Sequence, residues 1–86
     1  MEFAFDAVKS RKNLKKHGID FVQVRALWDD PERIEVPART EDELRILVIG
    51  RTGREYWSVV VTYRNERTRI ISARRSRREE IHIHEG

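Results

Sequence analysis

The stretch Tyr56-Trp57-Ser58-Val59-Val60-Val61-Thr62-Tyr63 decides the fold, because it has the pattern of a central β-strand. Every second residue from Trp57 to Tyr63 is large and apolar, and the residues between them are also fairly apolar. A strand of this kind is covered on both faces. Shorter apolar runs predict its neighbours in an antiparallel meander, with strands at residues 33–36, 44–49 and 68–73 and hairpin loops at 50–53 and 64–67.

Helix signals lie on both sides of these strands in the sequence. The expected caps are Asp6 and Gly18 around a helix over residues 7–17, Asp20 with Gln23 at the start of a second helix, and Ser76 with Glu79 at the start of a third. The second helix should end near residues 29–31, and the third should run towards His84. Phe3 and Phe5 alternate with polar neighbours and predict a short edge strand. We therefore expect an α+β fold in a single domain, residues 1–86, with two N-terminal helices on a small antiparallel sheet of about four strands and a short C-terminal helix.

Composition narrows the class of protein. The chain has 86 residues and no cysteine, so disulfides and thiolate metal sites are excluded. No apolar run approaches the roughly 20 residues of a membrane span, and the first residues do not resemble a signal peptide. We expect a soluble cytoplasmic protein without a cofactor.

The net charge of +3 conceals a segregation of charge along the chain. Residues 1–17 carry five basic and two acidic side chains, and residues 51–78 carry nine arginines against Glu55 and Glu66. If these two regions converge, they form a face that attracts phosphate. The alternative is a solvated charged surface with scattered ion pairs.

A block of arginines follows the last expected strand, in the segment Thr68-Arg69-Ile70-Ile71-Ser72-Ala73-Arg74-Arg75-Ser76-Arg77-Arg78-Glu79. Guanidinium groups are permanently charged and forked, which suits a phosphate that gains charge during a reaction. Antiparallel pairing would place Arg74 and Arg75 near residues 50–57 and would separate them from Arg64. The candidates for contact with a phosphate backbone are Lys15, Lys16, Arg51, Arg54, Arg77 and Arg78.

Histidines and tryptophans offer further chemistry. His17 is the better acid–base candidate, because imidazole titrates near neutral pH, although it could equally complement the dipole at a helix end. His82 and His84 are two residues apart, so on a strand both would face one way and could bind a metal. No third ligand lies nearby in the sequence, and a frayed tail is the favoured interpretation. Trp28 and Trp57 could stack on bases, and their spacing favours the core. Cations with a titratable histidine are the parts needed for RNA cleavage without a metal.

The order of several motifs resembles one known family. The motifs are Phe5-Asp6, Lys9, Asn13, Lys16-His17-Gly18-Ile19, Trp28-Asp29-Asp30-Pro31 and the strand end from Arg69 to Arg75. Together they resemble the BrnT toxins of bacterial type II toxin–antitoxin systems. The resemblance implies a RelE-like fold, an endoribonuclease that blocks translation, and neutralisation by a ribbon-helix-helix antitoxin whose complex also binds operator DNA.

The resemblance also suggests site residues. The positions that match recurring polar residues of the family are Lys9, Asn13, Lys16, His17, Arg64, Ser72, Arg74, Arg75 and Glu79. Of these, Lys9, His17, Arg64, Arg74 and Arg75 are the predicted catalytic residues. The chain departs from the family where Phe5 replaces a frequent tryptophan and His84 a tyrosine. The alternatives to a ribonuclease are a basic nucleic-acid-binding module and a protein-interaction module without catalysis.

Overall fold

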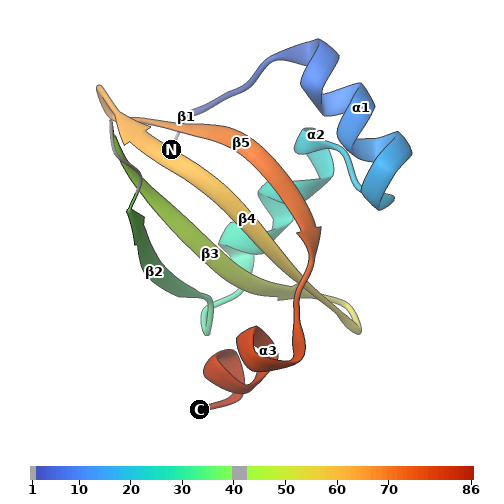
Figure 1. Ribbon diagram of the computed structural model, residues 1–86, viewed down its shortest axis with the longest axis vertical. Coiled ribbons are helices and arrows are strands. Elements are labelled where there is room, and N and C mark those ends of the chain that lie inside the picture. The colour runs from blue at the N-terminus through green and yellow to red at the C-terminus, as the bar shows by residue number, and fades with distance from the viewer. Residues whose placement is uncertain (1, 40–42) are drawn as a thin grey trace.

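The computed structural model describes residues 2–39 and 43–86 and contains a five-stranded sheet (Figure 1). Its order is β1-β5-β4-β3-β2. The strands are β1 (Glu2–Ala4), β2 (Ile34–Arg39), β3 (Leu44–Thr52), β4 (Glu55–Arg64) and β5 (Arg67–Arg75). The expected central strand is therefore confirmed as β4, which is paired antiparallel to β3 on one side and to β5 on the other.

Helices cover the two faces of the sheet unequally. The helices are α1 (Ala7–His17), α2 (Phe21–Val24), the 3-10 helix η1 (Arg25–Asp29) and α3 (Arg78–Glu85). Phe21, Val24 and Leu27 are buried in one core cluster with alternate residues of β4, including Val59 and Val61. Ser58, which points to the opposite face, accordingly bonds to α3. Figure 1 shows α2 and its continuation η1 passing behind β5 and β4, away from α3.

The caps at the first two helices form as the sequence predicts. The Asp6 carboxylate accepts from the backbone N–H groups of Val8 and Lys9, and Gly18 ends α1 with a φ of 81°. Asp20 and Gln23 form a reciprocal capping box. The second helix ends at Asp29, but it tightens from α to 3-10 geometry at Arg25.

The sheet differs from the expected four-stranded meander. Strand β1 pairs with β5 in parallel, so the sheet is mixed and has five strands. Two aromatic contacts hold the N-terminal segment in place: Phe3 packs edge-on against Trp28 with ring centroids 5.0 Å apart, and Phe5 packs against Phe21 at 5.8 Å. Such long-range contacts are not visible in a local periodicity.

Predicted boundaries are wrong at both hairpin loops and at the start of the third helix. The loop expected at residues 64–67 is limited to residues 65 and 66, because Arg64 ends β4 and Arg67 begins β5. The loop expected at residues 50–53 is shorter, because β3 continues through Thr52 and the turn lies at Gly53 and Arg54. The third helix does not begin with a box between Ser76 and Glu79. Instead, the Glu80 carboxylate accepts from the backbone N–H of Arg77 at 2.7 Å. Among the described residues, no helix is long and apolar enough to cross a membrane.

Candidate functional site

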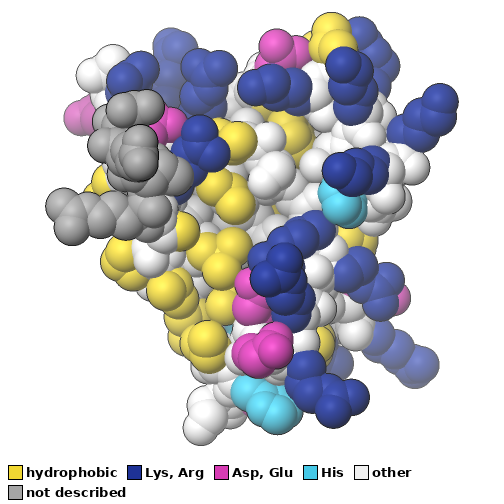
Figure 2. All heavy atoms as spheres, viewed as in Figure 1, with side chains coloured by type: hydrophobic (Ala, Val, Ile, Leu, Met, Phe, Trp, Pro, Cys, Tyr) yellow, Lys and Arg dark blue, Asp and Glu magenta, His cyan; other side chains and the backbone are white. Residues whose placement is uncertain are grey.

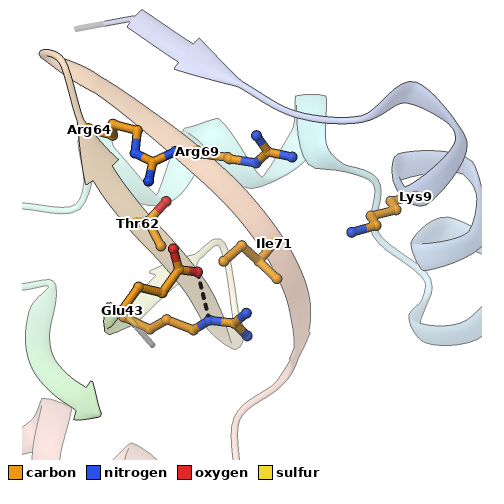
Figure 3. Close-up of a pocket in the computed structure, with 7 residues that line it drawn as sticks. Lys9, Glu43, Thr62, Arg64, Arg69 and Ile71 are labelled. Atoms are coloured by element: carbon orange, nitrogen blue, oxygen red, sulfur yellow. Dashed lines mark hydrogen bonds and ion pairs between the residues drawn. The ribbon is translucent and has the colours of Figure 1, made fainter. Parts of the chain in front are cut away.

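A hollow rich in cations lies on the sheet face that carries α3. Alternation along the strands directs Thr62 and Arg64 of β4 and Arg69 of β5 to this face, and Lys9 points across from α1 (Figure 3). This central hollow encloses about 160 Å³. Its complete lining is Lys9, Glu43, Arg45, Thr62, Arg64, Arg69 and Ile71.

A second hollow continues from the first along α1. This helix hollow is lined by Lys9, Lys12, Asn13, Lys16, His17, Phe21, Ile71 and Ser72. Lys9 and Ile71 line both hollows, so the two adjoin, and together they are here called the cationic groove. Residues 9, 12, 13, 16 and 17 recur at intervals of three and four and therefore share one face of α1.

A β-bulge shapes the floor of the groove. Val60 pairs with Ser72 while the next residue, Val61, pairs with Ile70, which leaves Ile71 as an extra residue in β5. Ile71 and Ser72 consequently both line the groove, although they are adjacent in the strand. Bulges redirect side chains in this way and are frequent beside active sites.

Asn13 fixes α1 against β5. Its side-chain amide donates to the carbonyl oxygens of Ile19 and Ala73 at 2.8 and 2.9 Å, and its oxygen accepts from the N–H of Ala73 at 3.2 Å. Asn13 is buried, so losing these bonds would leave polar groups unsatisfied. These contacts give Asn13 a structural role.

The cations of the groove are largely unpaired. Within residues 2–39 and 43–86, no salt bridge is formed by Lys9, Lys12, Lys16, Arg64 or Arg69. Arg45 is an exception, because it pairs with Glu43 at 3.3 Å. Figure 2 shows Lys and Arg side chains gathered across the upper and right parts of this face, from the β4–β5 turn to α1. The resulting positive potential attracts an anionic ligand.

Arg74 lies outside the groove and has a partner. Its guanidinium binds both carboxylate oxygens of Glu80 at 2.8 Å, and Glu80 also accepts from the Ser58 hydroxyl at 2.9 Å. The hydrogen bond from Arg74 is the main reason that the pKa of Glu80 falls to about 2. This buried network attaches α3 to the sheet.

Arg75 is also paired, although it is more exposed. It forms a salt bridge with Glu55 and lies over the Trp57 ring, with 5.4 Å between its guanidinium carbon and the ring centroid. The expected separation of Arg64 from Arg74 is confirmed by the register: Arg64 lies opposite Arg67, and Arg74 lies opposite Ser58. Along a strand these positions are about 20 Å apart.

The other predicted contact residues are scattered. Lys16 lies in the groove, whereas Lys15 is exposed on α1 and lines neither hollow. Arg51 and Arg54 lie at the β3–β4 turn, and Arg77 and Arg78 lie at the start of α3. The residues that the sequence interpretation did not select are Lys12, Arg45, Thr62 and Arg69. Arg67 and Arg69 alternate along the strand, which indicates that they share a face of the sheet. The prediction instead favoured the arginines at the end of the strand.

The prediction of a frayed tail is wrong for His84. Its imidazole bonds to the Asp30 carboxylate at 2.8 Å, and both side chains are at most 10% exposed. Burial raises the pKa of Asp30, but the hydrogen bonds from His84 and from the backbone of Glu32 and Arg51 outweigh it and lower the pKa overall. His82 is exposed, and the described residues contain no cluster of three potential metal ligands. Trp57 is a core residue, as expected.

Comparison with known protein families identifies a family that this chain matches. The profile of a family described as "Ribonuclease toxin, BrnT, of type II toxin-antitoxin system" matches residues 5–80. A search of the curated proteins finds no match.

Proposed function

Since the chain belongs to the BrnT family of ribonuclease toxins of type II toxin–antitoxin systems, we propose that it cleaves RNA in the cationic groove between α1 and β5. The observation that carries this proposal is the set of cations on the groove walls, among them Lys9, Arg64 and Arg69, which form no salt bridge within residues 2–39 and 43–86. Phosphate is the anion that RNA presents at every nucleotide. Cations held by a helix and two strands are positioned before the substrate arrives.

The chemistry proposed is attack of a ribose 2′-hydroxyl on the adjacent phosphate, without a metal. A base removes the hydroxyl proton, the oxygen forms a bond to phosphorus, and the bond to the 5′ oxygen breaks as an acid protonates that oxygen. Lys9, Arg64 and Arg69 stabilise the charge that accumulates on the phosphate oxygens. His17, at the end of α1 and in the same groove, carries out one of the two proton transfers.

Arg74 acts through α3 in this proposal. Its two bonds to Glu80 hold the helix at the edge of the groove face, so it is a positioning residue and the direct catalytic role predicted for it passes to Arg69. For Arg75, which was predicted to be catalytic, we propose contact with the RNA backbone instead, because a phosphate can compete with Glu55 for an exposed guanidinium.

The partner proposed is a ribbon-helix-helix antitoxin that covers the groove and thereby keeps RNA out. Operator DNA is bound only by the complex of toxin and antitoxin. We also propose that the fold is related to that of RelE-type ribonucleases. Cleavage of messenger RNA is the proposed way in which the protein blocks translation.

The test is induced expression of the wild-type chain and of the double variant Lys9→Gln/Arg69→Gln in bacteria. We expect growth arrest and decay of total RNA for the wild type and normal growth with intact RNA for the variant, because a lost transition-state cation costs about 10²–10³-fold in rate. The matched control is Arg25→Gln, an exposed arginine on η1, which should remain as toxic as the wild type.

Purified protein separates catalysis from binding. His17→Ala should bind a non-cleavable 2′-O-methyl RNA as the wild type does, yet cleave unmodified RNA far more slowly in buffer with EDTA. If the RNA stays intact although the wild-type protein is soluble and folded, the ribonuclease proposal is contradicted. The protein would then be a nucleic-acid-binding module without catalysis. An unchanged pH–rate profile in His17→Ala would remove this histidine from the proton transfers.

A further inference from the structure

A third hollow extends the cationic groove towards the β4–β5 turn. This turn hollow, of about 470 Å³, is lined by Glu2, Ala4, Arg64, Asn65, Arg67 and Arg69. Arg64 and Arg69 also line the central hollow, so the two hollows adjoin. Since Lys9 and Ile71 join the central hollow to the helix hollow, three concavities follow one another over the same face.

The order of the three hollows follows β5. Arg67 and Arg69 lie at its start, Ile71 and Ser72 lie in its middle, and α1 flanks the middle with the face that carries Lys12. The six residues from Arg67 to Ser72 span about 16 Å, five steps at the usual rise of a strand. The concavity is therefore an elongated path and not a single phosphate-sized pocket.

We propose that this path binds one segment of single-stranded RNA through at least three consecutive phosphates, one in each hollow, with the reacting phosphate in the central hollow. The proposal rests on the proposed function and adds the length and strandedness of the substrate. Arg67 and Lys12 bind the outer phosphates, which do not react. Lys9, Arg64 and Arg69 lie at the junctions between hollows, where each can contact two neighbouring phosphates.

The lining of the path favours a single strand over a duplex. Glu2 lies at the outer end of the path, where it pairs with Arg67 at 3.6 Å, and Glu43 lies on the β3 side, where it pairs with Arg45. These two carboxylates line the turn hollow and the central hollow, so phosphates in the path must lie against the cations and away from Glu2 and Glu43. The apolar side chain of Ile71 offers a surface for an unstacked base, which a paired base cannot use.

The salt dependence of binding measures the number of phosphates that the path neutralises. For single strands the logarithm of affinity falls with the logarithm of salt concentration with a slope of about −0.7 per phosphate, so three phosphates give about −2. We expect the affinity of the wild type for a 2′-O-methyl RNA octamer to fall about 20-fold between 50 and 200 mM salt. For Arg67→Gln and for Lys12→Gln, the fall should be about 7-fold. Arg25→Gln is the matched control and should behave as the wild type does.

Chain length and strandedness complete the test, with binding followed by fluorescence anisotropy. Affinity should increase from a dinucleotide to a tetranucleotide and then level off apart from a statistical gain, and an RNA duplex of the same sequence should bind more weakly. Three results would each overturn the proposal: salt slopes that are unchanged in both end variants, Arg67→Gln and Lys12→Gln; no gain in affinity beyond a dinucleotide; or equal affinity for the duplex. If the end variants lost affinity only for the antitoxin, the turn hollow would be a protein contact.

Cleavage of unmodified RNA is measured in parallel, so that the two proposals can fail separately. If the RNA stays intact but the salt slopes are as predicted, the proposed RNA-binding path is supported and the ribonuclease activity is contradicted. If cleavage is normal but the salt slopes do not depend on Arg67 or Lys12, the ribonuclease activity is supported and the proposed RNA-binding path is contradicted.

Discussion

A single glycine sets how closely η1 approaches the sheet. A Cβ atom added at Gly50 would lie 2.8 Å from Cγ and 3.1 Å from Cβ of Leu27, which is fully buried. Gly50→Ala should therefore lower the free energy of unfolding by about 1–3 kcal/mol, as measured by urea denaturation. The double variant Gly50→Ala/Leu27→Ala provides the control. The double variant should lose less free energy of unfolding than the sum of the losses in the two single variants. Additive losses would mean that the two side chains do not compete for space.

The residues of the groove were only partly predictable from the sequence. Lys9, Lys16, His17 and Arg64 were selected, and the structure places all four in the cationic groove. Arg74 was selected for its position at a strand end, but the sequence does not reveal that Glu80, six residues later on another element, neutralises it. For the same reason the tail position of His84 gave no sign of its bond to Asp30, which is far away in the chain.

The attachment of α3 depends on the charge of Glu80. The pKa of Glu80 is about 2 in the folded protein, mainly through Arg74, against an ordinary value of 4.5. A lowered pKa means that the unfolded chain binds the proton more tightly. The contribution to stability is therefore complete above about pH 4.5 and is lost as the pH falls towards 2. We expect thermal unfolding of the wild type to show a marked decrease in midpoint across this window.

Two arginine variants test the same attachment at neutral pH. Arg74→Gln leaves a buried carboxylate without its charged partner and should cost about 3 kcal/mol, with a weaker dependence on pH below 4.5. Arg75→Gln removes an adjacent arginine whose side chain is 63% exposed, and it should cost less than about 1 kcal/mol. Equal losses in the two variants would show that the Glu80 network does not fasten α3.

At the level of elements, the sequence predicted what local patterns encode. Caps such as Asp6 and Gly18 and the alternation in β4 act within a few residues, and these elements were confirmed. The parallel pairing of β1 with β5 joins residues more than sixty positions apart and depends on aromatic packing, so it was missed. The turn at Gly53 was placed too early because Gly50, which looks like a loop residue, serves the packing of η1.

Across the whole molecule, the requirements of function oppose those of stability. Within the described residues, Lys9, Lys12, Lys16, Arg64 and Arg69 of the cationic groove form no salt bridge, and their mutual repulsion destabilises the folded state when no anion is bound. Lys9→Gln/Arg69→Gln should therefore melt at a higher temperature than the wild type in low salt, although it no longer cleaves RNA. The difference should disappear near 1 M salt, where the Debye length falls to about 3 Å. Scanning calorimetry at the two salt concentrations measures both effects, with Arg25→Gln as the control for removal of an isolated charge. A lower melting temperature of the double variant in low salt would mean that these cations support the fold, and the loss of cleavage would then reflect unfolding rather than a missing phosphate contact.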